Sequence, residues 1–130
     1  MRGFFFIFVA VMRNFDLITI LGPTACGKTK LAVALADRIG GEILSADSRQ
    51  VYRGMDIGTG KDLADYRVGD RTVPYHLIDI AEPGSKYNVY EFQGDFLKAY
   101  KGVVERGAQP IMCGGTGLYL ESVLRGYRLI

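Results

Sequence analysis

An α/β fold, in which helices flank a parallel sheet, is predicted for this 130-residue chain by two patterns. Short apolar or β-branched stretches alternate with stretches of helical periodicity, as is typical of strand–helix–strand units. The first strand-like stretch, Leu17–Leu21, is apolar at nearly every position, as expected for a strand covered on both faces. The length of the chain predicts one domain with a single modest core.

The predicted elements of the first half follow directly from these patterns. After the first strand, apolar positions recur at helical spacing from Thr29 to Ile39, and Gly40 and Gly41 supply the stop signal. Residues Glu42–Ser45 are predicted to form the second strand. No regular element is predicted between residues 46 and 74, where the periodicity is weak.

The second half continues the alternation. Residues Tyr75–Ile80 are predicted to form another short strand. Asn88, followed three residues later by Glu91, predicts a capping box at the start of a helix that ends near Gly107. The remaining predictions are a strand at Pro110–Cys113, a tight turn at residues 114–117 and a helix at Leu118–Leu124.

Residues 1–15 are predicted to be an apolar extension and residues 16–130 the core. Gly3–Met12 form a continuous apolar run between Arg2 and Arg13. A membrane-spanning helix needs about 20 apolar residues, so no stable membrane span is expected. No small-residue cleavage site of a signal peptide follows the run. The open interpretations are an upstream segment before a working start at Met12, a disordered or packed extension, and association with a membrane.

Composition excludes several classes of protein. With 48% hydrophobic and 23% charged residues, the chain resembles an ordinary globular domain. Its net charge of +2 does not by itself predict nucleic-acid binding. Cys26 and Cys113 lack the spacing of a disulfide framework or a zinc site, and the single histidine, His76, has no partners for a metal cluster. A reducing compartment is expected, and the predicted location is cytoplasmic.

A phosphate-binding loop is predicted directly after the first strand, which makes the expected fold P-loop NTPase-like. The segment GPTACGKT matches G-x-x-x-x-G-K-[ST] and lies between a strand and a helix, as this loop requires. Backbone N–H groups and the helix dipole would bind the anion, Lys28 would neutralise phosphate oxygens, and the Thr29 hydroxyl would ligate Mg²⁺. A glycine-rich turn without a ligand is the alternative. The predicted diphosphate- or nucleotide-binding residues, which would also bind ATP, are Gly22, Pro23, Thr24, Ala25, Cys26, Gly27, Lys28 and Thr29.

Two further segments follow predicted strands. Asp47 comes just after the second strand, and the carboxyl ends of parallel strands face the ligand crevice, so Asp47 is expected near the phosphate loop. There it would accept a proton from a nucleophile or help to hold a metal; an aspartate that caps the next turn is the alternative. The turn at residues 114–117 would bring its N–H groups and the Thr116 hydroxyl to the same anion, and a plain glycine turn is the competing interpretation.

Four sequence blocks resemble, in their order, the amino-terminal part of bacterial tRNA dimethylallyltransferases, the isopentenyl diphosphate:tRNA transferase family. The blocks are GPTACGKTKLAVALA, SADSRQVYRGMDIGTGK, PYHLIDI and GGTGLYLESVL, and the likeness covers residues 16 to about 126. The second block is the most specific, because nucleotide kinases share the phosphate loop but lack this block. The resemblance implies transfer of a dimethylallyl group from dimethylallyl diphosphate to N6 of the adenine next to the tRNA anticodon.

The resemblance also implies roles for individual residues. The phosphate loop would hold the diphosphate leaving group with Mg²⁺ and stabilise its developing charge. In the family, the aspartate that matches Asp47 is the general base that acts on the adenine amine. The threonine that matches Thr116 lies at the tRNA and substrate site. The resemblance therefore predicts that Asp47 and Thr116 are catalytic residues. The adenine would be flipped out of its stack. The residues implied in tRNA binding are Asp47, Ser48, Arg49, Gln50 and Thr116.

Other polar residues near these blocks have simpler interpretations. Arg49, Arg53 and Lys61 would either contact phosphates or belong to a solvated loop face. Tyr52 is expected to be a packing residue, and His76 a satisfied polar residue at a strand edge.

Members of the family are longer than this chain, and their later half carries a helical insertion that grips the anticodon arm and further basic active-site residues. None of these is found in the 130 residues, so the sequence resembles a truncated member. We therefore expect this chain to bind diphosphate but to transfer poorly. A sheet left with an uncovered face or edge is expected to be marginally stable or to self-associate.

Three other functions compete with this one. A small-molecule kinase would hold ATP in the loop and use Asp47 to activate a hydroxyl, but no arginine-rich lid segment is evident. An adenine-nucleotide isopentenyltransferase is the second, although DSRQ and IGTGK are closer to the tRNA type. A non-catalytic nucleotide-binding fragment is the third; the intact Lys28, Thr29 and Asp47 argue against it, whereas the resemblance to a truncated member argues for it.

Overall fold

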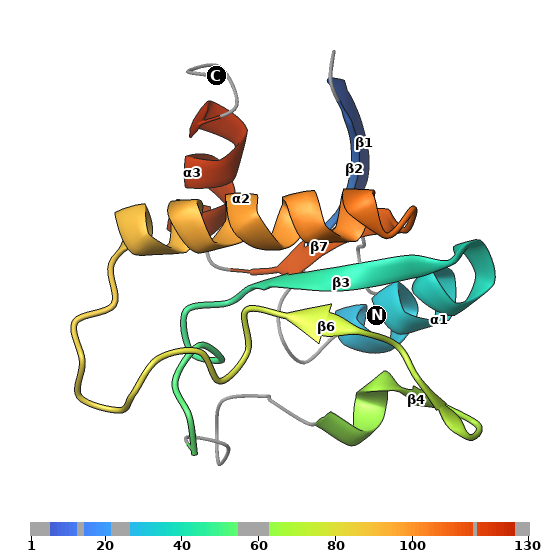
Figure 1. Ribbon diagram of the computed structural model, residues 1–130, viewed down its shortest axis with the longest axis horizontal. Coiled ribbons are helices and arrows are strands. Elements are labelled where there is room, and N and C mark those ends of the chain that lie inside the picture. Colours follow the sequence, from blue (N-terminus) through green and yellow to red (C-terminus); the bar gives the residue numbers. More distant parts are fainter. Residues whose placement is uncertain (1–5, 13–14, 22–26, 55–62, 116, 127–130) are drawn as a thin grey trace.

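The predicted parallel sheet with helices on both faces is confirmed by the computed structural model (Figure 1). The structure describes residues 6–12, 15–21, 27–54, 63–115 and 117–126. The main sheet has the strand order β1-β2-β7-β3-β6, in which β1 is antiparallel to β2 and the other neighbours are parallel. Its strands are β1 (Phe6–Met12), β2 (Phe15–Leu21), β3 (Gly41–Ala46), β6 (Tyr75–His76) and β7 (Gln109–Gly114).

Two helical layers bury the faces of the sheet. Helix α1 (Lys28–Ile39) covers one face, and helices α2 (Val89–Glu105) and α3 (Gly117–Gly126) cover the other (Figure 1). The core under α1 is built around Ile43 and Ile111, and the core under α2 around Phe92 and Phe96. Every residue of β3 is buried, as expected for a strand between two helical layers.

The predicted helix ends are confirmed by their capping contacts. Helix α1 stops at Gly40, whose φ of 73° lies in the left-handed region that glycine adopts readily. The Asn88 side chain accepts a hydrogen bond from the Glu91 N–H at 2.8 Å, and the Glu91 side chain accepts one from the Asn88 N–H at 3.4 Å. This reciprocal pair is the predicted capping box.

The strand predicted at residues 75–80 is too long. Only Tyr75 and His76 pair with β3, because Leu77 adopts a φ of 71° that turns the chain away from the sheet. The region without predicted elements holds a short 3₁₀ helix, η2 (Leu63–Tyr66), and a hairpin of β4 (Arg67–Val68) and β5 (Arg71–Thr72). Both η2 and β4 contact α1.

The apolar amino-terminal stretch contains an edge strand that was not among the predicted elements. Phe6 of β1 lies opposite Leu21 of β2, and Met12 lies opposite Phe15. Among the described residues, no helix is long and apolar enough to cross a membrane.

Candidate functional site

The carboxyl ends of β2, β7 and β3 meet at one edge of the sheet. Gly114 ends β7 and pairs with Leu21 of β2 on one side and with Ala46 of β3 on the other. Because neighbouring strands lie about 4.8 Å apart, β2 and β3 end about 10 Å from each other. Asp47 directly follows Ala46, so the structure places it at the edge where β2, the strand before the predicted phosphate loop, also ends.

Glycine is required at the centre of this edge. A Cβ atom on Gly114 would collide with the carbonyl group of Ala46, so only glycine lets β7 and β3 lie this close together. The first glycine of the predicted turn at residues 114–117 therefore has a packing role. Thr116, predicted to be catalytic and to bind tRNA, lies outside the described residues.

Of the predicted phosphate loop, the structure describes Gly27, Lys28 and Thr29. Residues 22–26, which hold Gly22, Pro23, Thr24, Ala25 and Cys26, lie outside the described part of the chain. Gly27 has φ 79° and ψ 20°, a left-handed conformation that turns the chain into α1. The structure thus explains why a glycine stands directly before Lys28.

Lys28 is buried at the first position of α1, with an exposed fraction of 3%. A buried ammonium group is costly without an anionic partner, and no ion pair to Lys28 is found among the described residues. Thr29 follows in the same turn and is partly exposed. A buried cation beside a helix N-terminus is an arrangement that favours a phosphate or diphosphate ligand.

Asp47 is also buried, with an exposed fraction of 3%, and it organises the turn that follows β3. Its Oδ1 accepts a hydrogen bond from the Arg49 backbone N–H at 2.9 Å and lies 3.4 Å from the Arg49 Nε. Its backbone carbonyl accepts a hydrogen bond from the Gln50 N–H at 3.0 Å. The carboxylate therefore caps its own turn through Oδ1, while the hydrogen bonds found among the described residues leave Oδ2 for another partner.

The other residues of this turn lie close to Asp47 but differ in exposure. Gln50 is buried, and its side-chain oxygen accepts a hydrogen bond from the Ser45 hydroxyl at 3.1 Å. Ser48 is half-buried and Arg49 is exposed. The structure thus brings Asp47, Ser48, Arg49 and Gln50 together in one turn at the carboxyl edge.

Two tyrosines near Asp47 were not identified from the sequence. Burial raises the pKa of Tyr119 to about 12, with smaller contributions from Tyr52 and Asp47. Burial is also the main reason that the pKa of Tyr66 is raised, and the nearby Cys113 and Asp47 add to it. Tyr119 belongs to the core under α2 and Tyr66 to the core under α1, so the two tyrosines lie on opposite faces of the sheet. Tyr66 lies in the region without periodicity, where the sequence offered no signal.

The structure tests what the sequence predicted for three other polar residues, Tyr52, His76 and Arg53. Tyr52 packs against the core under α2, as predicted. The Nε2 of His76 lies 2.7 Å from a side-chain oxygen of Glu42, which confirms His76 as a satisfied residue on an edge strand. Arg53 is directed to protein groups: its Nε donates to the carbonyl of Asp79 at 3.0 Å, and its guanidinium pairs with Glu82. Lys61 lies outside the described residues.

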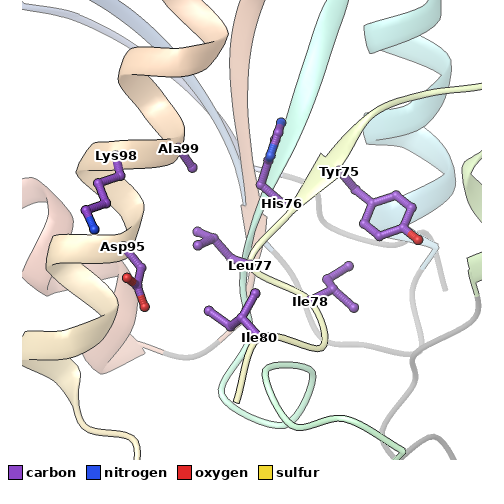
Figure 2. Close-up of a pocket in the computed structure, with 8 residues that line it drawn as sticks. All are labelled: Tyr75, His76, Leu77, Ile78, Ile80, Asp95, Lys98 and Ala99. Atoms are coloured by element: carbon purple, nitrogen blue, oxygen red, sulfur yellow. The ribbon is translucent and has the colours of Figure 1, made fainter.

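A cavity of about 540 Å³ lies between α2 and the segment formed by β6 and the turn that follows it (Figure 2). Figure 2 shows Leu77 and Ile80 directed toward α2, whereas Tyr75 and Ile78 lie on the other side of the chain. Neither Lys28 nor Asp47 lines it. No cluster of three potential metal-ligating side chains occurs in the described parts of the chain.

Comparison with protein families identifies related sequences over most of the chain. The model of the "IPP transferase" family matches residues 50–130, and that of the "Isopentenyl transferase" family matches residues 15–72. A tRNA dimethylallyltransferase of Bacteroides fragilis is 66% identical over 119 residues, which are 92% of this chain and 39% of the relative. A tRNA dimethylallyltransferase of Porphyromonas gingivalis is 67% identical over 113 residues, 87% of this chain and 37% of the relative.

Solved structures agree with this assignment and with the P-loop NTPase-like fold. The full-length tRNA isopentenylpyrophosphate transferase of Bacillus halodurans has a TM-score of 0.78 at 48% identity, over 88% of this chain and 37% of that one. A eukaryotic dimethylallyltransferase acting on tRNA has a TM-score of 0.73 at 32% identity, over 82% of this chain and 25% of that one. The chain spans about two fifths of the curated relatives. Because a family model matches more than half of its residues, this chain belongs to the IPP transferase family.

Proposed function

We propose that this chain carries the diphosphate- and base-binding edge of a tRNA dimethylallyltransferase. The enzyme would transfer a dimethylallyl group from dimethylallyl diphosphate to N6 of the adenine next to the tRNA anticodon, a cytoplasmic reaction. The observation that carries the proposal is a buried lysine and a buried aspartate at one edge of the sheet, on either side of the strand that ends at Gly114. The names of the tRNA-modifying relatives support the same reaction.

The proposed chemistry assigns different tasks to Lys28 and Asp47. The bond between the allylic carbon and the diphosphate oxygen breaks, and negative charge accumulates on the departing diphosphate. Lys28 and the N–H groups at the start of α1 would stabilise that charge. A bond forms between N6 and the allylic carbon, and the surplus N6 proton passes to Asp47, whose Oδ2 is the oxygen left by the capping contacts.

Mg²⁺ is the implied cofactor, and the donor set at this edge suits it. Magnesium keeps several waters and is usually held by one or two protein oxygens together with substrate phosphates. The Thr29 hydroxyl in the first turn of α1 is the described group that would hold it, together with the substrate diphosphate and water. Bound magnesium would neutralise charge on the diphosphate.

A titration of this chain with dimethylallyl diphosphate and with ATP, each with magnesium, tests the proposal. We expect tighter binding of dimethylallyl diphosphate, measured by calorimetry. A clear preference for ATP would instead favour the small-molecule kinase, and no binding of either ligand would contradict a phosphate site at Lys28.

The Asp47→Asn variant tests the role of the base. Replacing the carboxylate by an amide keeps the oxygen that caps the turn but removes the proton acceptor. We expect the affinity for dimethylallyl diphosphate to change by less than about twofold and transfer of labelled dimethylallyl to tRNA to fall by about 100-fold or more. Because we expect the basal transfer of this chain to be low, it is measured under single-turnover conditions. Unchanged transfer would remove Asp47 from the mechanism.

A further inference from the structure

The chain that follows β6 contains two strained residues. Leu77 has a φ of 71° and Asp79 a φ of 59°, and among the described residues they are the only non-glycine residues with positive φ. A leucine rarely adopts this left-handed conformation because its Cβ crowds the backbone. Such strain persists where the surrounding structure enforces it, and it clusters at functional sites.

Packing on both faces of the sheet enforces this conformation. Leu77 is buried in the core under α2, and the next residue, Ile78, is buried in the core under α1. Figure 2 shows their side chains on opposite sides of the chain. The strained turn is therefore anchored in two cores, and it has little freedom to shift along the sheet.

The strained turn holds the segment that follows Asp47. The Asp79 N–H donates to the Gln50 carbonyl at 3.0 Å, and the Ile80 and Ala81 N–H groups both donate to the Val51 carbonyl, at 2.8 and 2.9 Å. The Arg53 N–H returns a hydrogen bond to the Ala81 carbonyl at 2.9 Å. These four backbone hydrogen bonds fasten residues 50–53 to residues 79–81.

The Arg53 side chain adds two contacts to these four backbone hydrogen bonds. Its Nε donates to the carbonyl of Asp79, one of the two strained residues, at 3.0 Å, and its guanidinium pairs with Glu82. The first residue in this set of hydrogen bonds is Gln50. Its N–H donates to the Asp47 carbonyl, and its side chain accepts a hydrogen bond from Ser45. A continuous set of hydrogen bonds thus leads from Arg53 to Asp47.

We propose that Arg53 is a positioning residue, which locks the strained turn at residues 77–79 against residues 50–53 and thereby sets the place of the Asp47–Gln50 turn. The base-binding part of this inference rests on the proposed function. A positioning role for Arg53 differs from the alternative in which the Arg53 side chain contacts a phosphate. Arg53 acts through the protein backbone, so its loss should disturb the Asp47–Gln50 turn and leave diphosphate binding intact.

Amide hydrogen exchange, followed by NMR on the whole chain, tests the lock. In Arg53→Ala we expect the amides of Asp79, Ile80 and Ala81 to exchange at least about tenfold faster, with β7 amides unchanged. Two matched variants are the controls. Arg71→Ala removes a different exposed arginine, which pairs with Asp37, and Glu82→Gln weakens only the exposed ion pair; both should stay within about twofold of the parent chain.

Ligand binding separates positioning from phosphate contact. In Arg53→Ala we expect affinity for an adenine-containing anticodon stem-loop RNA to fall at least about tenfold and affinity for dimethylallyl diphosphate to change less than twofold. Unchanged exchange at residues 79–81, or equally faster exchange in β7, would overturn the proposal. Loss of diphosphate affinity would make Arg53 a phosphate ligand and overturn it too. If the parent chain binds no stem-loop, the base-binding part of this inference fails, while the exchange data still decide whether Arg53 locks the turn.

Discussion

Two buried carboxylates lie at opposite ends of β3, and the protein surrounds them differently. Glu42, near the amino end, accepts two hydrogen bonds from the Arg106 guanidinium at 2.7 and 3.0 Å and lies 2.7 Å from the His76 Nε2. Asp47 lies just past the carboxyl end, and its Oδ1 is 3.4 Å from the Nε of Arg49. The Arg49 side chain is about half exposed. Side chains from two other elements bind the Glu42 carboxylate, whereas the Asp47 carboxylate is held mainly by its own turn.

The same difference extends to the surroundings of each end. The amino end of β3 has its charges paired within the chain, whereas the carboxyl end combines buried Lys28, buried Asp47 and the strained residues Leu77 and Asp79. Buried charges that the described residues leave with few charged partners, together with strained backbone, are features of sites that bind a ligand. We infer that the amino end serves stability and the carboxyl end serves binding.

The largest expected effect is that of Lys28→Ala. Removal of the buried ammonium group should weaken binding of dimethylallyl diphosphate by about 100-fold, or about 3 kcal/mol, because a charge-assisted contact to the phosphate is lost. Unfolding by urea should be unchanged or slightly harder, since no ion pair of the described residues is broken. Lys30→Ala, an exposed lysine of the same helix, is the control and should bind normally. Marked destabilisation of Lys28→Ala would mean that the lysine is structural.

Gly114→Ala should affect both stability and binding. The added Cβ collides with the Ala46 carbonyl, so β3 must shift just before Asp47. We expect a loss of about 2 kcal/mol in the free energy of unfolding, typical of overpacking, together with weaker ligand binding. Gly94→Ala, where a Cβ meets nothing within 4 Å, is the matched control. Normal stability of Gly114→Ala would show that β7 and β3 have room for a Cβ atom at this position.

Glu42→Gln is expected to have the opposite pattern to Lys28→Ala. It weakens hydrogen bonds from Arg106 and His76 to a buried charge, so the free energy of unfolding should fall by about 2 kcal/mol. Affinity for dimethylallyl diphosphate should stay within twofold. Glu82→Gln breaks an exposed pair and should change unfolding by less than about 1 kcal/mol. Weaker binding of dimethylallyl diphosphate by Glu42→Gln would contradict separate roles for the two ends of β3.

The pH dependence of stability should report on the same carboxylate. The hydrogen bond from Arg106 is the main reason that the pKa of Glu42 lies below its ordinary value of 4.5; burial opposes this shift and His76 supports it. The unfolded chain then binds the proton more readily, so the stabilisation is complete above that ordinary value and is lost as the pH falls through the folded-state pKa. In urea unfolding, the advantage of the parent chain over Glu42→Gln should shrink below pH 4.5. A difference independent of pH would contradict this origin.

The smallest expected effect is that of Asn88→Ala. The variant removes the acceptor for the Glu91 N–H at the start of α2, and loss of such a cap costs about 1 kcal/mol. Although this cap lies in sequence between the strained turn and β7, we expect diphosphate affinity to be unchanged in calorimetry. A change in affinity would extend the binding region to the start of α2.

Local features of the chain were predictable, and long-range ones were not. The capping box at Asn88, the stop at Gly40 and the strands around Ile18 and Ile111 follow from residue preferences within a few positions. By contrast, nothing near Leu77 predicts a left-handed leucine, because packing against two separate cores imposes that conformation. The strand at residues 75–80 was overextended for this reason.

The candidate site divides in the same way. Lys28 and Asp47 could be predicted as site residues because a short motif marks the first and a strand end marks the second. The role of Arg53 depends on residues 79–82, which the fold brings to it across 26 to 29 positions of sequence. The position of Gly114 between β2 and β3 likewise depends on the order of the strands, and the placement of Tyr66 and Tyr119 on opposite faces depends on the helical layers.

Amide chemical-shift mapping tests most directly whether the two ends of β3 have separate roles. The isotope-labelled chain is titrated with dimethylallyl diphosphate and magnesium, and the amides that move are identified. We predict that the amides of Gly27, Lys28, Thr29 and Asp47 shift at saturation, while those of Glu42, His76 and Arg106 stay in place. Shifts centred on Glu42, or no shift at Lys28, would contradict the assignment of the carboxyl edge as the ligand site.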